Sequence, residues 1–279
     1  MKKAVMVFTK VPKAGDVKTR LTEKRGGILT PEEANDLYIA CMLDVVDACI
    51  EACTEATDSD MWICYNKDGD RAYLDTLLAK VDHPEKIVGV FPDEGGHFNE
   101  CMQYATDNIL KSGEKNRLAD GLLIIGGDLP SIQPGIVIDA LNKLDSLSES
   151  EAGKKVALKN QAGSEIGASI VEGACQEGGF SIIGFTCSTP FDFTDVFYNL
   201  TGTTALDMLL DKATEGKIPF APVEMVPDID IPVDLASSIP VLRGIELAAK
   251  YDSTIFIPKR TVAVLEEMGI TSVALPPQR

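Results

Sequence analysis

Four basic side chains follow the first apolar stretch of the chain, in the segment VFTKVPKAGDVKTRL (7–21): Lys10, Lys13, Lys18 and Arg20. The first 25 residues carry eight Lys or Arg against two carboxylates, whereas the other 254 carry 18 basic and 41 acidic side chains. Arg binds phosphate through a bidentate fork, and Lys acts as a point charge. With Lys10 and the backbone NH groups around Gly15, Lys18 and Arg20 could therefore hold a di- or triphosphate. The alternative is a solvated surface loop, since the chain has neither a Walker loop nor a GxGxxG fingerprint after a strand.

A carboxylate ends the most continuous apolar run, in LLIIGGDLPSI (122–132). Gly126 and Gly127 leave room for a ligand or a tight turn, and Pro130 prevents the strand from continuing past Asp128. A hard oxygen ligand at this place suits Mg²⁺ or Mn²⁺ bridging phosphates. The alternative is that Asp128 only caps a helix that begins after Ser131.

A second acidic group occurs in PDIDIPVDL (227–235), where Pro232 opens a helix. Asp230 could be a second metal ligand that converges on Asp128. It could instead serve only as the cap of that helix, a role worth roughly 1 kcal/mol. In QEGGFSIIGF (176–185), Glu177 lies at the mouth of a Gly-Gly turn into a strand. The two histidines have no partner at metal-ligand spacing, and no Ser-His-Asp or Cys-His nucleophile is indicated.

Short apolar runs alternate with amphipathic helical patterns, which predicts an α/β fold with a largely parallel sheet between helices. A helix start is predicted at Thr30, with Pro31 in the first turn and Glu33 closing a capping box. We predict a polar loop over 146–155 and a short strand over 156–159. Strands are also expected near 4–8, 61–65, 87–91, 121–125, 168–172, 181–184 and 220–226. Helices are expected near 34–52, 71–79, 99–110, 136–144, 203–212 and 233–250.

Composition limits the possible partners. A formal net charge of −17 argues against nucleic-acid and anionic-membrane binding, because most of the surface would repel both. No stretch approaches the ~18 apolar residues of a membrane span. The seven cysteines form no CxxC pair and favour buried thiols in a cytoplasmic protein. We expect a single domain over 1–279, in which 251–279 is a C-terminal extension with a helix and a strand.

Four segments, taken in order, resemble the motifs of one family. They are VFTKVPKAGDVKTRL, GGDLP, EGGFSIIG and DIDIPVDL, which are similar to F-x-K-x-P-x-x-G-x-V-K-T-R-L, G-x-D-x-P, D-G-G-[FY]-x-L-I-G and D-[IV]-D-T-P-x-D-L. These motifs are typical of glycosyltransferase-A-like proteins of the nucleotide-diphospho-sugar transferase superfamily. A more distant similarity is to phospholactate and molybdenum-cofactor guanylyltransferases. The resemblance covers about residues 4–245.

The resemblance implies a three-layer α/β/α sandwich that binds a nucleotide and Mg²⁺ or Mn²⁺. It implies that Lys18 and Arg20 bind phosphate and that Asp128 and Asp230 bind the metal and are catalytic, together with Glu177. The chain departs from the motifs where Glu177 replaces Asp and Ile231 replaces Thr, and the segment 197–209 is longer than usual.

The function that this resemblance favours is a metal-dependent transferase with a nucleotide or nucleotide-sugar donor and a small-molecule acceptor. Nucleotidyl transfer with release of pyrophosphate is the alternative. A non-catalytic nucleotide sensor is a third possibility, to which Glu177 and the altered 197–209 segment point.

Overall fold

The computed structural model describes residues 1–272, in which seven strands form one sheet of order β3-β2-β1-β4-β6-β5-β7. The strands are β1 (Lys3–Thr9), β2 (Ser59–Tyr65), β3 (Ile87–Pro92), β4 (Gly121–Gly126), β5 (Ile170–Ala174), β6 (Phe180–Thr186) and β7 (Phe220–Pro222). Strands β1 to β4 are mutually parallel, and β6 runs antiparallel to both β4 and β5. The predicted α/β class with a mostly parallel central sheet is confirmed.

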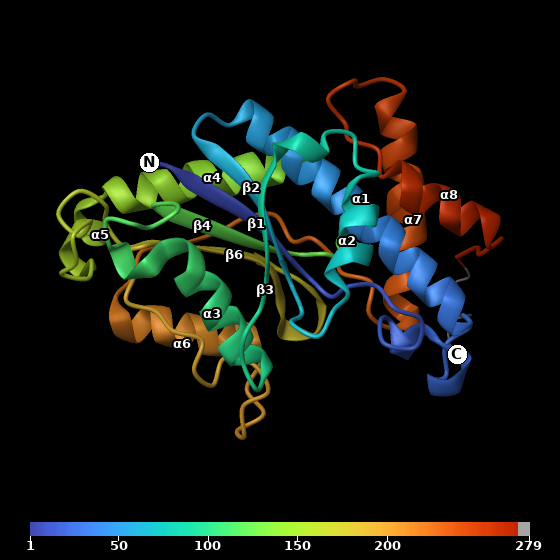
Figure 1. The fold of residues 1–279 in the computed structure, drawn as a ribbon, viewed down its shortest axis with the longest axis horizontal. Coiled ribbons are helices and arrows are strands. Elements are labelled where there is room, and N and C mark those ends of the chain that lie inside the picture. Colours follow the sequence, from blue (N-terminus) through green and yellow to red (C-terminus); the bar gives the residue numbers. More distant parts are fainter. Residues whose placement is uncertain (273–279) are drawn as a thin grey trace, which may run out of the picture.

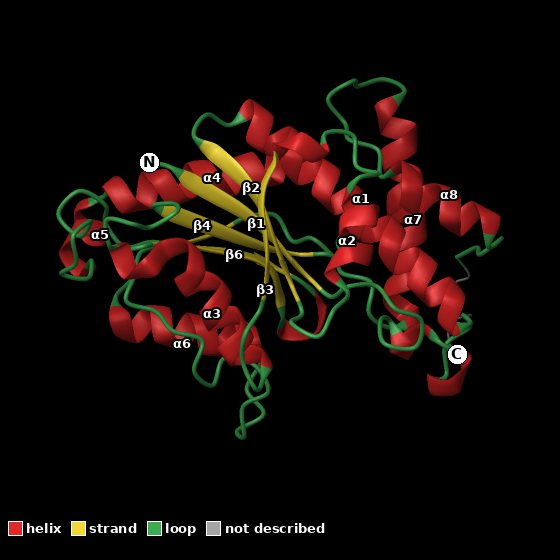
Figure 2. Cartoon of the chain, in the orientation of Figure 1, coloured by secondary structure: helices red, strands yellow, loops and turns green. Residues whose placement is uncertain are grey.

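Helices cover both faces of this sheet, which makes three layers (Figures 1 and 2). The helices are α1 (Pro31–Glu55), α2 (Arg71–Leu78), α3 (Phe98–Leu110), α4 (Pro134–Glu149), α5 (Glu151–Val156), α6 (Ala205–Gly216), α7 (Pro232–Ala249) and α8 (Lys259–Glu267). Single 3-10 turns lie at Thr19–Leu21, Glu23–Arg25, Pro84–Lys86, Lys111–Gly113 and Gln176–Gly178. Apolar residues of α1, α2 and α4 pack on one face, and those of α3 and α6 pack on the other.

In the central strands β1 and β4, the residues between the first and the last are apolar because both faces of these strands are covered. Successive side chains of a strand point to opposite faces. Val5 and Val7 of β1 therefore join the core under α1 and α4, whereas Ala4 and Met6 join the core under α3 and α6. This arrangement leaves the ends of β1 and β4 as the places where polar residues can come to the surface.

Helix α1 begins as the sequence predicts. The hydroxyl of Thr30 accepts a hydrogen bond from the backbone NH of Glu33 at 3.1 Å, and the carboxylate of Glu33 accepts one from the NH of Thr30 at 2.7 Å. Two backbone donors that have no partner inside the helix are thereby satisfied. The predicted capping box is confirmed.

Two predicted elements between 146 and 159 are wrong. Helix α4 continues through this segment to Glu149 because its apolar stripe continues to Leu147, which packs on the core. Ser150 then caps α5 by accepting the NH of Gly153 at 3.0 Å. The polar composition that suggested a loop is that of a helix cap and an exposed helical face, and the strand expected over 156–159 does not form.

Helices α7 and α8 pack beside α1 at the end of the molecule away from α5 (Figure 1). The ion pairs of Arg260 with Asp44 and Asp47 attach α8 to α1. The helix expected in the C-terminal extension is therefore present. The strand expected there is not found up to residue 272, and 273–279 lie outside the described residues. Within 1–272, none of the helices combines the length and apolarity that crossing a membrane requires.

Candidate active site

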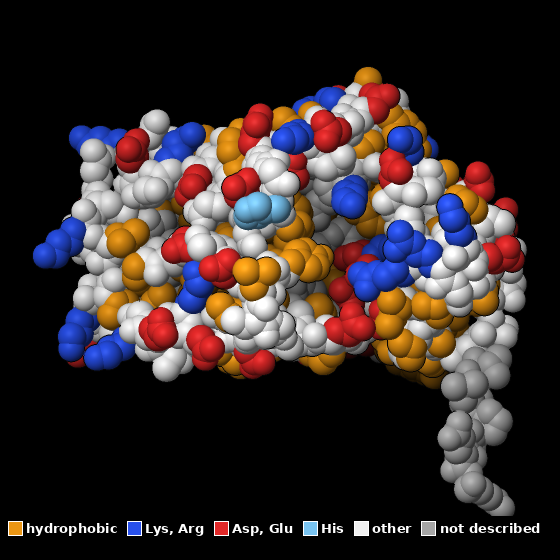
Figure 3. Space-filling model, turned by 90° about the horizontal axis from the view of Figure 1, so that it is seen from below, with side chains coloured by type: hydrophobic (Ala, Val, Ile, Leu, Met, Phe, Trp, Pro, Cys, Tyr) orange, Lys and Arg blue, Asp and Glu red, His pale blue; other side chains and the backbone are white. Residues whose placement is uncertain are grey.

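A cavity of about 460 Å³ opens at the carboxyl ends of β1 and β4. From β1 the sheet extends to β2 and β3 on one side and to β4 on the other. Crevices outside the carboxyl ends of strands at such a switch point are where open α/β sheets bind ligands. Figure 3 shows this face hollowed, with acidic side chains inside the hollow and basic ones along one rim.

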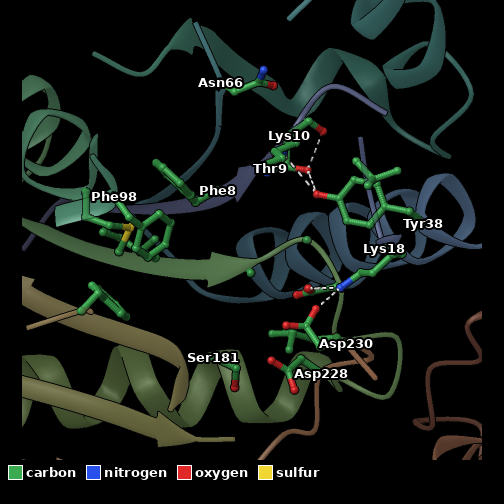
Figure 4. A pocket seen from close by; sticks show the side chains of 18 of the residues that line it. Phe8, Thr9, Lys10, Lys18, Tyr38, Asn66, Phe98, Ser181, Asp228 and Asp230 are labelled. Carbon is green, nitrogen blue, oxygen red and sulfur yellow. Dashed lines mark hydrogen bonds and ion pairs between the residues drawn. The ribbon is translucent and has the colours of Figure 1, made fainter. Parts of the chain in front are cut away.

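Lys18 lies at the centre of the charged part of the cavity (Figure 4). Its ammonium donates to Asp128 Oδ2 at 2.5 Å and to Asp230 Oδ1 at 2.6 Å, and its side chain is only 6% exposed. Arg20 donates to the other oxygen of Asp230 at 2.6 Å. Three segments that are distant in the sequence therefore meet at one cation.

Local backbone structure brings these groups together. Lys18 has a left-handed conformation, with φ of 47°, just before the 3-10 turn at Thr19–Leu21. Such a conformation costs on the order of 1 kcal/mol in a non-glycine residue and often marks functional sites. At the end of β4, a Cβ on Gly127 would lie 2.9 Å from the hydroxyl of Thr9, so this position requires glycine for the close approach of the two strand ends.

Neither Asp128 nor Asp230 serves as a helix cap. Helix α4 starts only at Pro134, and the carboxylate of Asp128 binds Lys18. At α7, Asp234 accepts the backbone NH groups of Asp230 and Ile231 at 3.0 and 2.9 Å. Because Asp234 satisfies these donors, the carboxylate of Asp230 is available for the cavity.

The charges around Lys18 influence one another strongly. Burial acts to lower the pKa of Lys18, but the carboxylates of Asp128 and Asp230 outweigh burial and hold that pKa well above its usual range. Burial acts to raise the pKa of Asp230, but Lys18 and Arg20 hold it below its ordinary value. Asp228 also lines the cavity, and burial together with repulsion from the other two aspartates raises its pKa to about 6.

The remaining site residues predicted from the sequence lie at different distances from this centre. Lys10 lines the cavity, directly after β1. Gly15 lies in an exposed turn, has φ of 84° and does not line the cavity. Glu177 is also outside the lining, with an exposed side chain 4.0 Å from Arg20. Lys13, also in the basic segment, pairs with Asp16 in solvent.

Tyr38 of α1 lines the cavity, although no sequence motif singled it out as a site residue. Its hydroxyl bonds to the Thr9 hydroxyl at 2.7 Å and accepts the backbone NH of Lys10 at 3.1 Å. The Lys18 ammonium lies 5.6 Å from the centre of its ring. A buried tyrosine hydroxyl needs a polar partner, and that requirement was the available signal.

Four aromatic side chains also line the cavity: Phe8, Phe98, Phe180 and Phe197. They come from β1, α3, β6 and the segment before α6. No sequence motif connects these four residues, and the sequence analysis missed them.

Asp128 and Asp230 are the residues that could hold a metal ion. Within 1–272 there is no group of three or more His, Cys, Asp or Glu arranged as a metal site. The two carboxylates nevertheless converge on one cation, the Lys18 ammonium. Magnesium is commonly bound by one or two carboxylates together with substrate phosphates and water, so this donor set fits.

A family model described as "uncharacterized protein conserved in bacteria (DUF2064)" matches residues 49–200, more than half of the chain. The chain belongs to the DUF2064 family. The part that matches the DUF2064 model contains Asp128 and Glu177, whereas Lys18, Arg20 and Asp230 lie outside it. The curated proteins give no match.

This DUF2064 member is similar in structure to solved proteins. The chain is 20% identical to a putative nucleotide-diphospho-sugar transferase from Desulfovibrio desulfuricans G20, with a TM-score of 0.68 and 96% of each chain covered. A cytidylyltransferase from Leptospira borgpetersenii serovar Hardjo-bovis is 14% identical over 100% of both chains, with a TM-score of 0.48. The first similarity confirms the nucleotide-diphospho-sugar transferase type of fold.

Proposed function

We propose that this protein is a metal-dependent transferase whose donor is nucleotide-activated, with a nucleotide-diphospho-sugar as the donor class. One observation carries the proposal. Lys18 and Arg20 meet Asp128 and Asp230 at the carboxyl ends of β1 and β4, inside a cavity of ligand size. Both the cations that phosphate needs and the carboxylates that a divalent metal needs are thus within hydrogen-bond distance of one another.

In the proposed reaction, Arg20 binds phosphate oxygens of the donor. About half of its side chain is exposed, and Nη1 lies 4.0 Å from Glu177 Oε2, beyond hydrogen-bond distance, which leaves donors available. Lys18 stays charged and stabilises the negative charge that develops on the leaving phosphate. A magnesium or manganese ion held by Asp128 and Asp230 would add further charge neutralisation at the diphosphate.

The transfer step forms one bond and breaks one. The acceptor hydroxyl oxygen bonds to the anomeric carbon of the sugar, and the bond from that carbon to the phosphate oxygen breaks. The electron pair of the broken bond leaves with the nucleoside diphosphate, and the acceptor proton passes to water. The chain orients the two reactants, which by itself accounts for a large part of enzymatic rate acceleration.

A thermal-shift panel tests donor binding directly. The panel contains ATP, CTP, GTP, UTP, UDP-glucose and GDP-mannose, each with manganese and each with chelator. A ligand at ~100 times its dissociation constant adds about 2.7 kcal/mol to the free energy of unfolding. We expect a clear rise in Tm for at least one nucleotide with manganese and a smaller rise with chelator. A flat response across the panel would reject the proposal.

The leaving group identifies the reaction. For the nucleotide that binds, release of nucleoside diphosphate in the presence of an acceptor indicates glycosyl transfer. Release of pyrophosphate indicates nucleotidyl transfer, in which the acceptor attacks the α-phosphate. Tight binding without either product indicates a nucleotide sensor.

A further inference from the structure

The cavity has an aromatic end that the proposed donor does not use. This aromatic end consists of Phe8, Phe98, Met102, Phe180, Ile183 and Phe197. Figure 4 shows Phe8 and Phe98 on the side of the cavity away from Lys18 and Tyr38. The cavity therefore joins a charged end, suited to phosphates, to an apolar end of different chemistry.

The rings of the aromatic end pack edge to face around Phe98. The ring centre of Phe98 lies 5.8 Å from that of Phe8 and 4.7 Å from that of Phe197, at interplanar angles of 83° and 79°. Phe180 lies 5.1 Å from Phe197. Such pairs are favourable and hold the rings in defined orientations.

Helix α3 holds this wall in place through two amide side chains. Asn99 donates to the backbone carbonyl of Phe197 at 2.9 Å and accepts its NH at 2.8 Å. Gln103 accepts the NH of Phe193 at 3.0 Å. These bonds fix the chain between β6 and α6 against α3, so the aromatic end is a built surface.

Apolar surface continues outward from the aromatic end. The ring of Tyr198 lies 6.3 Å from that of Phe98 and is 90% exposed. This exposed ring beside Phe98 extends the apolar surface that a ligand can contact.

The aromatic end is unsuited to the nucleobase of the donor, whose edge needs hydrogen-bond partners. Ser181 lines the cavity beside Phe180, and its single hydroxyl proton is shared between the carbonyl oxygens of Val226 at 3.0 Å and Gly173 at 3.3 Å. The side-chain amide of Asn99 is likewise already bonded to the backbone of Phe197. Polar lining residues lie instead at the ends of β1, β2 and β3, where Lys10, Asn66 and Asp93 follow the strands. The nucleobase therefore fits the β1–β3 side.

We infer that the acceptor is an alcohol whose hydroxyl is carried on an apolar, ring-containing body, and that this body lies against Phe98 and Phe197. The inference rests on the proposed function, because a transferase must hold its acceptor next to the donor phosphates. The aromatic end adjoins the charged end within one cavity. An acceptor body there places its hydroxyl toward Lys18 and Asp228. Transfer then follows the bond changes given above for the acceptor oxygen.

Binding of two alcohols, measured without any nucleotide, tests this inference. 2-Phenylethanol represents the apolar acceptor and glycerol a polar one, and both are titrated by NMR. We expect 2-phenylethanol to bind at least tenfold more tightly than glycerol. Phe98→Ala should lower the affinity for 2-phenylethanol at least fivefold. Tyr104→Ala is the matched control, because Tyr104 is on the same helix, has the same 38% exposure and does not line the cavity.

Tyr198→Ser keeps the test valid if Phe98→Ala folds poorly, because the exposed ring of Tyr198 contributes little to the core. We expect Tyr198→Ser to lower the affinity for 2-phenylethanol about twofold. The nucleotide that the thermal-shift panel identifies should bind Phe98→Ala as tightly as it binds the unmodified protein.

Equal affinity of the unmodified protein for the two alcohols would overturn the inference. An equal loss of 2-phenylethanol affinity in Phe98→Ala and Tyr104→Ala would overturn it too. A fivefold loss of nucleotide affinity in Phe98→Ala would also overturn it, because the aromatic end would then hold the nucleobase. If 2-phenylethanol binds as expected but no nucleotide binds, the apolar site stands and the proposed function fails.

Discussion

Two places in the molecule hold one cation between two aspartates. In the cavity, Lys18 bonds to Asp128 and Asp230. Between α8 and α1, Arg260 bonds to Asp44 at 3.1 Å and to Asp47 at 2.5 Å. The two clusters contain similar groups, but their surroundings differ.

The Arg260 cluster is closed. Asp44 is 1% exposed, and one of its oxygens also accepts the backbone NH and the hydroxyl of Thr261 at 2.7 and 2.8 Å. The Lys18 cluster borders a cavity, and its cation lies on a residue with left-handed backbone. In the Arg260 cluster, protein donors saturate the carboxylate of Asp44, and the cluster holds α8 against α1. In the Lys18 cluster, the carboxylates share one cation beside a cavity and can exchange that cation for a ligand.

The largest effect is expected from breaking the closed cluster. Asp44→Ala removes one of the two buried partners of Arg260 and the only carboxylate that accepts from Thr261 among the described residues. Removal of one member of a buried ion pair costs about 3–5 kcal/mol. Urea denaturation measures the loss. Asp82→Ala is the control, because Asp82 is exposed and 3.7 Å from Arg260, and it should change stability by less than about 0.5 kcal/mol. Equal losses in the two variants would show that the cluster does not hold α8.

Glu172 of β5 is a buried carboxylate with no ion pair among residues 1–272. It is 4% exposed, one of its oxygens has no hydrogen-bond partner, and burial raises its pKa from 4.5 to about 7. The folded protein therefore binds this proton more tightly than the unfolded chain does. Its contribution to stability is complete below pH 4.5 and is lost as the pH rises to 7, by up to about 3 kcal/mol.

Glu172→Gln should remove the loss of stability that ionisation of Glu172 causes as the pH rises. We expect the variant to gain stability relative to the unmodified protein as the pH rises from 4.5 to 8, measured by urea denaturation at several pH values. Glu224→Gln, at an exposed position, is the control. Its difference in stability from the unmodified protein should stay constant over the same pH range. A constant difference for Glu172→Gln as well would mean that Glu172 has an ordinary pKa.

Arg20→Ala tests the open cluster. We expect it to weaken binding of the nucleotide by about 1.5–3 kcal/mol, the scale of a hydrogen bond to a charged group, with little change in stability. Isothermal calorimetry measures the affinity. Arg25→Ala is the control, because Arg25 is exposed on the same segment and outside the cavity lining. Unchanged affinity in Arg20→Ala would indicate that the basic segment is only a solvated loop.

The smallest expected effect is the coupling between Asp128 and Asp230. Each Asp→Asn change should raise the manganese concentration needed for nucleotide binding. If both residues hold one ion, the double variant should lose less binding free energy for manganese than the two single variants lose in total. The difference should be about 0.5–3 kcal/mol. Asp234→Asn is the control, because Asp234 only caps α7. Strict additivity would mean that the two carboxylates do not share a metal.

Much of the architecture could be predicted because it depends on local patterns. The apolar runs that became β1 and β4, and the capping box of Thr30 and Glu33, are set by neighbours along the chain. The error at 146–155 has the same origin, because Ser and Glu favour helix caps as well as loops. Deciding between them required the packing of Leu147 on the core.

The sequence by itself determined that Lys10 and Asp128 follow the ends of strands, since each follows a recognisable apolar run. Only the tertiary structure decided their partners. Asp128 and Asp230 are 110 and 212 residues from Lys18, and only the close approach of Gly127 to Thr9 and the cap by Asp234 orient all three toward one another. The aromatic end formed in the same way, from residues with no local relation. Contacts between distant segments depend on how whole elements pack, and no local pattern encodes them.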